Sequence, residues 1–220
     1  MIPPAVWRYR PQAESTDRVV LKCSCVLPTV AVLLQDSIEY IKTEITDMVD
    51  QICASGPHCV IRLAFVGYTD YGCPEVPHQD FSEDIGAFEK LLDTIEVSGL
   101  GINRDNAEDV FSGLQAAGKL SWTSTNRILV HVGDAPCHGQ EFHEYPSGEF
   151  KDKYPDGDKL GRDAGELLLH LAETCKLDRY IFCHLSAMTK KMIQRFQQLL
   201  GELSCLMLLV QVVLHTWSYF

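Results

Sequence analysis

Several signatures of nucleotide-binding and hydrolytic enzymes are missing from this sequence. Neither G-x-G-x-x-G nor G-x-x-x-x-G-K-[ST] follows the first apolar run, so the main support for a dinucleotide site or a P-loop is lacking. No G-x-S-x-G turn presents a serine nucleophile. No run of Lys or Arg occurs, and the net charge is -11. The chain therefore offers no broad attraction for phosphate backbones or anionic membranes, and we expect neither nucleic acid nor membrane as a partner.

The cysteines and the longest apolar run also lack the patterns of common special classes. Nine cysteines are an odd number, and no pair forms C-x-x-C, so no zinc knuckle or redox motif is indicated. The start of the chain has three prolines, Pro3, Pro4 and Pro11, and no continuous apolar stretch, so we expect no signal peptide there. The run from Ser204 to Trp217 is shorter than the roughly 20 residues of a membrane span and contains Gln211 and His215. We expect a buried strand in this run and a reducing, cytoplasmic location.

The chain has enough hydrophobic residues to build one hydrophobic core. The chain has 220 residues, of which 46% are hydrophobic. This length favours a single soluble domain rather than two. We predict a poorly ordered leader over residues 1–18, a domain over residues 19–215 and a short tail over residues 216–220.

Apolar, β-branched runs alternate with amphipathic segments along this domain. We predict strands in the run that ends near Leu34 and over residues 59–68, 127–132 and 179–184. We predict helices over residues 38–52, 106–117, 165–175 and 189–200, and a further helix that contains Phe88 and Ile95 and ends at Ser98-Gly99. Such alternation favours an α/β fold with a doubly wound, largely parallel sheet and helices on both faces. Ligands of such sheets bind at the carboxyl ends of the strands, where Asp36, Asp70 and Asp134 would meet.

The stretch ILVHVGDAPCHGQEFH, residues 128–143, contains the densest chemistry. Asp134 follows an apolar strand, so its carboxylate is solvated, held by helix N-terminal amides or used on a cation. Cys137, His138 and His143 could form a zinc site with Asp134, although their spacing is uncommon for zinc and Pro136 indicates a turn. Catalysis by Cys137 with His138 is a weaker alternative, since adjacent residues of a turn rarely face each other.

Six stretches together resemble a known family. They are LAFVGYTDYG (63–72), FSEDIGAFEKLLDTIEVSGLG (81–101), AEDVFSGLQAAGKLSW (107–122), ILVHVGDAPCHG (128–139), YPDGDKLG (154–161) and FCHLSAMTKKMIQRF (182–196). In this order, over about residues 30–200, the sequence resembles the von Willebrand factor A domain of alpha-kinase-type proteins. The resemblance implies a Rossmann-like, mostly parallel six-stranded sheet with helices on both faces.

The resemblance also implies a metal-ion-dependent adhesion site at the carboxyl edge of the sheet. In the family, oxygen ligands there hold Mg²⁺ and leave a position for a partner's carboxylate. Asp134 and Asp105 match two of the family's ligands, and Asp36 and Ser37 match part of the motif after the first strand. That motif is otherwise changed, because Val32 and Leu34 replace an aspartate and a threonine. Since Mg²⁺ needs near-octahedral oxygen coordination, we expect a degenerate site with Mg²⁺ weakly bound or absent.

The sequence thus predicts a non-enzymatic interaction module that binds a protein partner through loops at the carboxyl edge. We expect no catalytic residues and no cofactor-binding residues. One alternative is a regulatory fragment of an alpha-type protein serine/threonine kinase, because no kinase catalytic segment follows residue 200 and the chain has the length of a truncated or alternatively spliced product. Another is a hydrolase that uses Asp134, Cys137 and His138.

Overall fold

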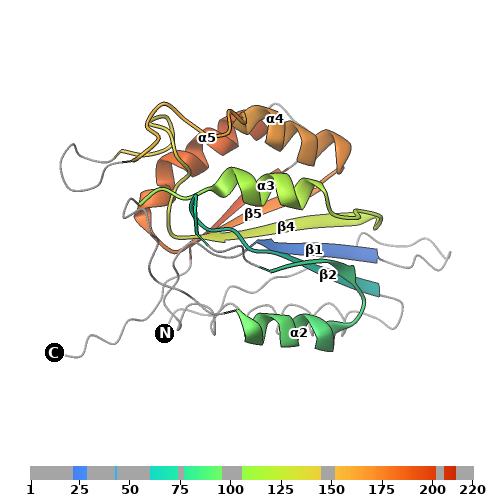
Figure 1. Ribbon diagram of the computed structural model, residues 1–220. Helices are drawn as coiled ribbons and strands as arrows, with labels where there is room; N and C mark the ends of the chain where they lie inside the picture. Colours follow the sequence, from blue (N-terminus) through green and yellow to red (C-terminus); the bar gives the residue numbers. More distant parts are fainter. Residues whose placement is uncertain are drawn as a thin grey trace, which may run out of the picture.

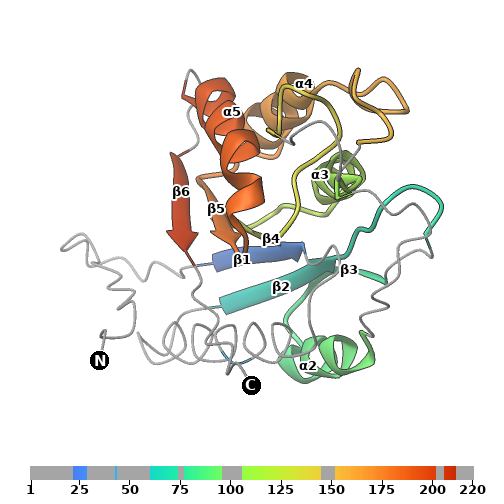
Figure 2. The ribbon, with the colours of Figure 1, turned by 90° about the vertical axis from the view of Figure 1, so that its left-hand side faces the viewer.

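Six strands form one sheet in the order β3-β2-β1-β4-β5-β6 (Figures 1 and 2). The computed structural model describes residues 22–28, 43, 60–73, 77–95, 106–144, 152–201 and 206–211. The strands are β1 (Lys22–Pro28), β2 (Val60–Val66), β3 (His78–Ser82), β4 (Asn126–Gly133), β5 (Arg179–His184) and β6 (Leu206–Gln211). Neighbouring strands are parallel except for β2 and β3, which pair antiparallel at one edge.

The described helices lie on the two faces unequally, as two views of the ribbon show (Figures 1 and 2). Helix α2 (Ile85–Thr94) lies against one face, whereas α3 (Val110–Gly118), α4 (Ala164–Leu169) and α5 (Lys190–Leu200) lie against the other. A π-helical turn, η1 (His170–Thr174), continues α4, and a 3-10 turn, η2 (Ala187–Thr189), precedes α5. No helix among the residues that the structure describes is long and apolar enough to cross a membrane.

Aspartates fix where three of these helices begin. The side chains of Asp84, Asp109 and Asp163 each accept a hydrogen bond from the backbone N–H three residues on. Such N-caps satisfy amides that have no partner within the helix. Asp109 thereby sets the start of α3 beside the carboxyl edge of the sheet, a position that matters for the site below.

The main core lies between the sheet and α3, α4 and α5. Its largest fully buried side chains include Leu168, Tyr180, Phe182 and Phe196. One polar group, His131 of β4, is buried among them, and its two ring nitrogens lie 2.6 Å from the hydroxyls of Tyr68 and Tyr180. Burial lowers the pKa of His131 to about 3, so the neutral imidazole links the two tyrosines as a structural group.

The structure corrects the predicted doubly wound, mostly parallel arrangement in two respects. The first strand was predicted to end near Leu34, but β1 ends at Pro28, and residues 29–42 lie outside the described part of the chain. The edge strand β3 was not predicted, because its polar sequence HQDFS lacks an apolar run, and it runs antiparallel to β2.

Smaller boundaries also differ from the sequence prediction. The third helix was predicted over residues 106–117 but starts after Asp109, because the carboxylate of Asp109 accepts a hydrogen bond from the backbone N–H of Ser112. The predicted helix 165–175 changes from α to π geometry at His170. β6 lies inside the run that was predicted to be a buried strand, whereas residues 212–220 lie outside the described part.

Candidate functional site

Three loops are joined at the carboxyl ends of the parallel strands. They are residues 67–73 after β2, residues 134–144 after β4 and residues 152–163 before α4. Gly139 has a φ of +109°, and a Cβ on it would lie 3.2 Å from the Cα of Gly157. Glycine is therefore needed where the second and third loops approach each other.

The first network in this region is built around His138, whose side chain is almost fully buried. Its Nε2 lies 2.8 Å from Oδ1 of Asp70, and its Nδ1 lies 2.7 Å from Oδ1 of Asp152. Asp152 is also 2.8 Å from Nε2 of His143 and accepts a hydrogen bond from the backbone N–H of Gly139. One buried imidazole thus connects all three loops.

The network favours the charged forms of its members. Burial alone would lower the pKa of His138, but the hydrogen bonds to Asp152 and Asp70 outweigh burial and raise that pKa to about 9. Burial likewise opposes ionisation of Asp152, yet the bonds from His138 and His143 hold its pKa well below the usual range. At neutral pH the structure therefore holds an imidazolium between two carboxylates, which leaves His138 unsuited to act as a general base.

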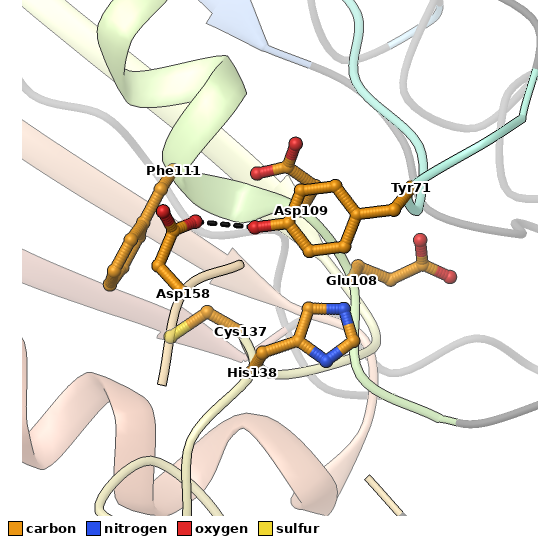
Figure 3. A pocket seen from close by; sticks show the side chains of 7 residues that line it. All are labelled: Tyr71, Glu108, Asp109, Phe111, Cys137, His138 and Asp158. Carbon is orange, nitrogen blue, oxygen red and sulfur yellow. Dashed lines mark hydrogen bonds between the residues drawn. The ribbon is translucent and has the colours of Figure 1, made fainter. Parts of the chain in front are cut away.

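The second network is built around Arg162. Its Nη2 lies 2.6 Å from Oδ1 of Asp158 and 2.5 Å from Oδ1 of Asp109, and its Nη1 donates to the hydroxyl of Ser112 over 2.6 Å. The hydroxyl of Tyr71 donates to the same Asp158 (Figure 3). Burial opposes ionisation of Asp158, but the bonds from Arg162 and Tyr71 lower its pKa to about 2. The guanidinium thus ties the third loop to the start of α3.

A small pocket of about 130 Å³ lies between the two networks. Figure 3 shows the side chains that line it, which are Tyr71, Glu108, Asp109, Phe111, Cys137, His138 and Asp158. Cys137 is buried, and burial raises the pKa of its thiol well above the ordinary value. A buried neutral thiol is a poor nucleophile, which does not favour the hydrolase alternative. Within the described residues no three His, Cys, Asp or Glu side chains are arranged to hold a metal ion, which does not favour the zinc alternative.

Asp134 directly follows β4, at the edge where the sequence predicted it. Its Oδ1 is buried and has no hydrogen-bond partner among the described residues. Burial raises the pKa of Asp134 to about 7, although backbone amides of Asp134 and Ala135 act in the opposite direction. An unpartnered buried oxygen of this kind fits one ligand position of an oxygen-coordinated cation.

The other predicted metal ligands, Asp36, Ser37 and Asp105, lie outside the described residues. Within the described residues, no group of three or more His, Cys, Asp or Glu side chains is arranged to hold a metal ion. The described part of the chain thus supplies Asp134 as a single fitting oxygen ligand and does not complete an octahedral set.

Sequence reasoning missed most of the residues that build this region. Asp152, Asp158 and Arg162 lie in a polar segment rich in proline and glycine, and no motif in the sequence singles them out. The signal that could have found them is the alternation of aspartates with glycines around one arginine, since carboxylates that recur in a turn often accept backbone amides. Nothing in the sequence indicated that Arg162 would reach Asp109, which is 53 positions away.

Comparison with known proteins gives one related sequence of limited extent. No family model matches the chain. It is 29% identical over 171 residues to "Alpha-protein kinase vwkA" of Dictyostelium discoideum, and the match covers 76% of this chain and 26% of that protein. The chain therefore spans about a quarter of the length of this curated relative.

Two solved structures are similar at low sequence identity. The D319A mutant of the PilB minor pilin from Streptococcus sanguinis has a TM-score of 0.49 at 10% identity, covering 90% of this chain and 59% of that one. The pilus adhesin SpaC from Lactobacillus rhamnosus GG, in an open conformation, has a TM-score of 0.49 at 13% identity, covering 87% and 28%. These structural likenesses are too weak to support an argument about function. The sequence comparison shows similarity to one part of an alpha-protein kinase.

Proposed function

We propose that the chain is a non-enzymatic interaction module, related to the von Willebrand factor A domain of alpha-kinase-type proteins. It binds a protein partner through the three loops at the carboxyl edge of its sheet. The observation that carries this proposal is that buried ion pairs join the three loops to one another. Loops fixed in this way present a preorganised surface, which reduces the entropy lost when a partner binds.

The size and chemistry of the pocket support binding rather than catalysis. The space between its lining side chains is too small to hold a small molecule, whose sites typically have roughly 300–1,000 Å³. The two groups that sequence reasoning considered as nucleophile and base are a buried neutral thiol, Cys137, and an ion-paired imidazolium, His138. Neither is arranged to attack a substrate.

The similarity to vwkA supports a second, compatible proposal, that the module regulates an alpha-type protein kinase. In that case the partner surface would act on a catalytic domain or on its substrate. We further propose that Mg²⁺ binds weakly or not at all, with Asp134 as the remaining ligand at a degenerate site. The interaction surface does not depend on the metal in this proposal.

Two exposed leucines, one in the loops at the carboxyl edge of the sheet and one away from them, allow a matched test of the proposed partner surface. Leu160, which is 65% exposed, lies in the third loop, and Leu169, which is 47% exposed, lies at the far end of α4. We expect wild type and Leu169→Asp to recover the same proteins in quantitative affinity purification, and Leu160→Asp to lose them. Recovery unchanged by Leu160→Asp would contradict the proposed surface. Phosphate transfer from labelled ATP by the purified chain would contradict its non-enzymatic character.

A further inference from the structure

The ammonium group of Lys159 faces two aromatic rings at the rim of the edge. Its Nζ lies 5.3 Å from the centroid of the Tyr71 ring and 5.6 Å from that of the Tyr154 ring. Both distances are within the roughly 6 Å over which a cation is attracted by the face of a ring. Side chains of the protein itself thus occupy a small aromatic cage: Lys159 faces both rings, and Nζ of Lys153 lies 5.9 Å from the centroid of the Tyr154 ring alone.

The two rings form perpendicular walls that do not depend on the lysine side chain. Their centroids are 5.1 Å apart and their planes make an angle of 85°. His138 stacks on Tyr71 and meets Tyr154 edge to face, with centroids 5.1 and 5.0 Å away. The hydroxyl of Tyr71 is held by Asp158 and Arg162. Removing the Lys159 side chain should therefore leave the cage standing.

The backbone around Lys159 is fixed as well. The backbone N–H of Lys159 donates to the hydroxyl of Tyr71 over 3.3 Å, and the amides of Leu160 and Arg162 each donate to Asp158 over 2.9 Å. The side chain of Lys159, by contrast, is exposed to solvent. The lysine can swing away from the rings without any change of the loop.

The charge of the region suits a cation as the incoming group. The pocket beside Tyr71 is lined by three carboxylates, those of Glu108, Asp109 and Asp158, and the chain as a whole carries a net charge of -11. In the whole region five carboxylates, those of Asp70, Glu108, Asp109, Asp152 and Asp158, face four cations, those of His138, Arg162, Lys153 and Lys159, so a small excess of negative charge remains. A cationic side chain of a partner would be attracted here, and an anionic one would be repelled.

We infer that Tyr71 and Tyr154 form a cation site that Lys159 occupies in the free chain and that a partner's lysine-type ammonium group takes over. Methylated ammonium groups fit best, because they are less strongly hydrated and favour aromatic cages. The inference rests on the proposed function and gives the partner surface a chemical class. Lys159 then acts as an internal competitor that lowers the affinity of the free site.

Titration with a simple ammonium probe tests the inference. Nα-acetyl-trimethyllysine amide would be added to the purified full chain, and binding followed by NMR. Lys159→Ala should bind the probe at least fivefold more tightly than wild type. The matched control Lys119→Ala, at the far end of α3, should bind like wild type. Adding Tyr154→Leu to Lys159→Ala should abolish binding, with circular dichroism confirming that the variant is folded.

The outcomes separate this inference from the proposed function. If Lys159→Ala binds the probe no more tightly than wild type, the cation site is refuted, whatever happens to the partner. If Leu160→Asp still prevents recovery of the partner in that case, the interaction surface stands without the cage. If Lys159→Ala gains affinity for the probe but Leu160→Asp leaves partner recovery unchanged, the cage exists and the proposed partner surface is wrong.

Discussion

Nε2 of His138 lies 2.8 Å from Oδ1 of Asp70, although the two residues are 68 positions apart in the chain. Because Nδ1 of the same ring contacts Asp152, one side chain connects the loops after β2 and β4 with the loop before α4. The side chains of His138, Asp70 and Asp152 are all buried. Water therefore cannot take the place of the imidazolium beside either carboxylate unless the structure opens locally.

Truncation of His138 should therefore destabilise the protein strongly. His138→Ala leaves the carboxylates of Asp70 and Asp152 buried without their cation, which costs about 3 kcal/mol of unfolding free energy. Urea unfolding followed by circular dichroism measures the change. His170→Ala is the control, because His170 is exposed and makes one hydrogen bond, to the carbonyl of Gly118. A loss at His138 no larger than that of the control would show that the network is not a stabilising one.

The same network should make stability depend on alkaline pH. The hydrogen bonds to Asp152 and Asp70 overcome the effect of burial and raise the pKa of His138 to about 9 in the folded state. In the unfolded chain the pKa of a histidine is roughly 6.5. Because the folded pKa is higher, the ion pairs of His138 contribute fully to the unfolding free energy below about pH 6.5, and this contribution is lost as the pH rises through about 9. His138→Gln should thus remove a decrease in unfolding free energy that wild type shows from about pH 6.5 to about pH 9.

Arg162 should not tolerate replacement by lysine. Its guanidinium contacts Asp158, Asp109 and the hydroxyl of Tyr71 at once, a geometry that a single ammonium group cannot reproduce. We expect Arg162→Lys to lower the unfolding free energy by about 2 kcal/mol. The matched control Arg195→Lys should change it by less than about 0.5 kcal/mol, since the pair between Arg195 and Glu141 is exposed. Equal effects of the two substitutions would contradict the role given to Arg162.

The sequence located the buried strands well where apolar runs were continuous, as in β2, β4 and β5. It failed at β3, because a half-exposed edge strand such as HQDFS needs no apolar run and is held by pairing with β2. It also failed at the start of α3, where three acidic residues, Asp105, Glu108 and Asp109, compete as caps. The backbone N–H of Glu108 donates to the carbonyl of Pro136 in the loop after β4, and such a contact between distant segments cannot be read from the local sequence.

The candidate site was foreseen only in part. The position of Asp134 directly after β4 could be predicted from the sequence, since an apolar run ends there, whereas its role as a metal ligand stays a prediction. The ionic partners of His138 could not be foreseen, because Asp70 and Asp152 come from loops far away in the sequence. Clusters of Cys and His suggested zinc, whereas the fold uses these side chains as ion-paired or buried parts of the loop.

Titration with metals should give weak binding or none. Of the predicted Mg²⁺ ligands, the structure places Asp134 alone, and Val32 and Leu34 offer no side-chain oxygen at the changed motif. We expect calorimetry to show Mg²⁺ affinity weaker than about 1 mM. Asp134→Ala should leave the titration almost unchanged. Tight Mg²⁺ binding that Asp134→Ala abolishes would refute the degenerate site, and zinc binding lost with His138→Ala would restore the zinc hypothesis.

Gly113 in α3 should resist replacement although helix propensity favours alanine there by about 1 kcal/mol. A Cβ on Gly113 would lie 2.5 Å from Cδ1 of Tyr68, and that ring is held by the bond from its hydroxyl to His131. We expect Gly113→Ala to reduce the unfolding free energy by about 2 kcal/mol, because the buried ring has to move or α3 has to lift. Gly86→Ala in α2 is the matched control, since its nearest neighbour would be 3.5 Å away. The control should be neutral or stabilising by about 0.5 kcal/mol. If both variants behave alike in urea unfolding, the close approach of α3 to Tyr68 is not what fixes this helix over the sheet.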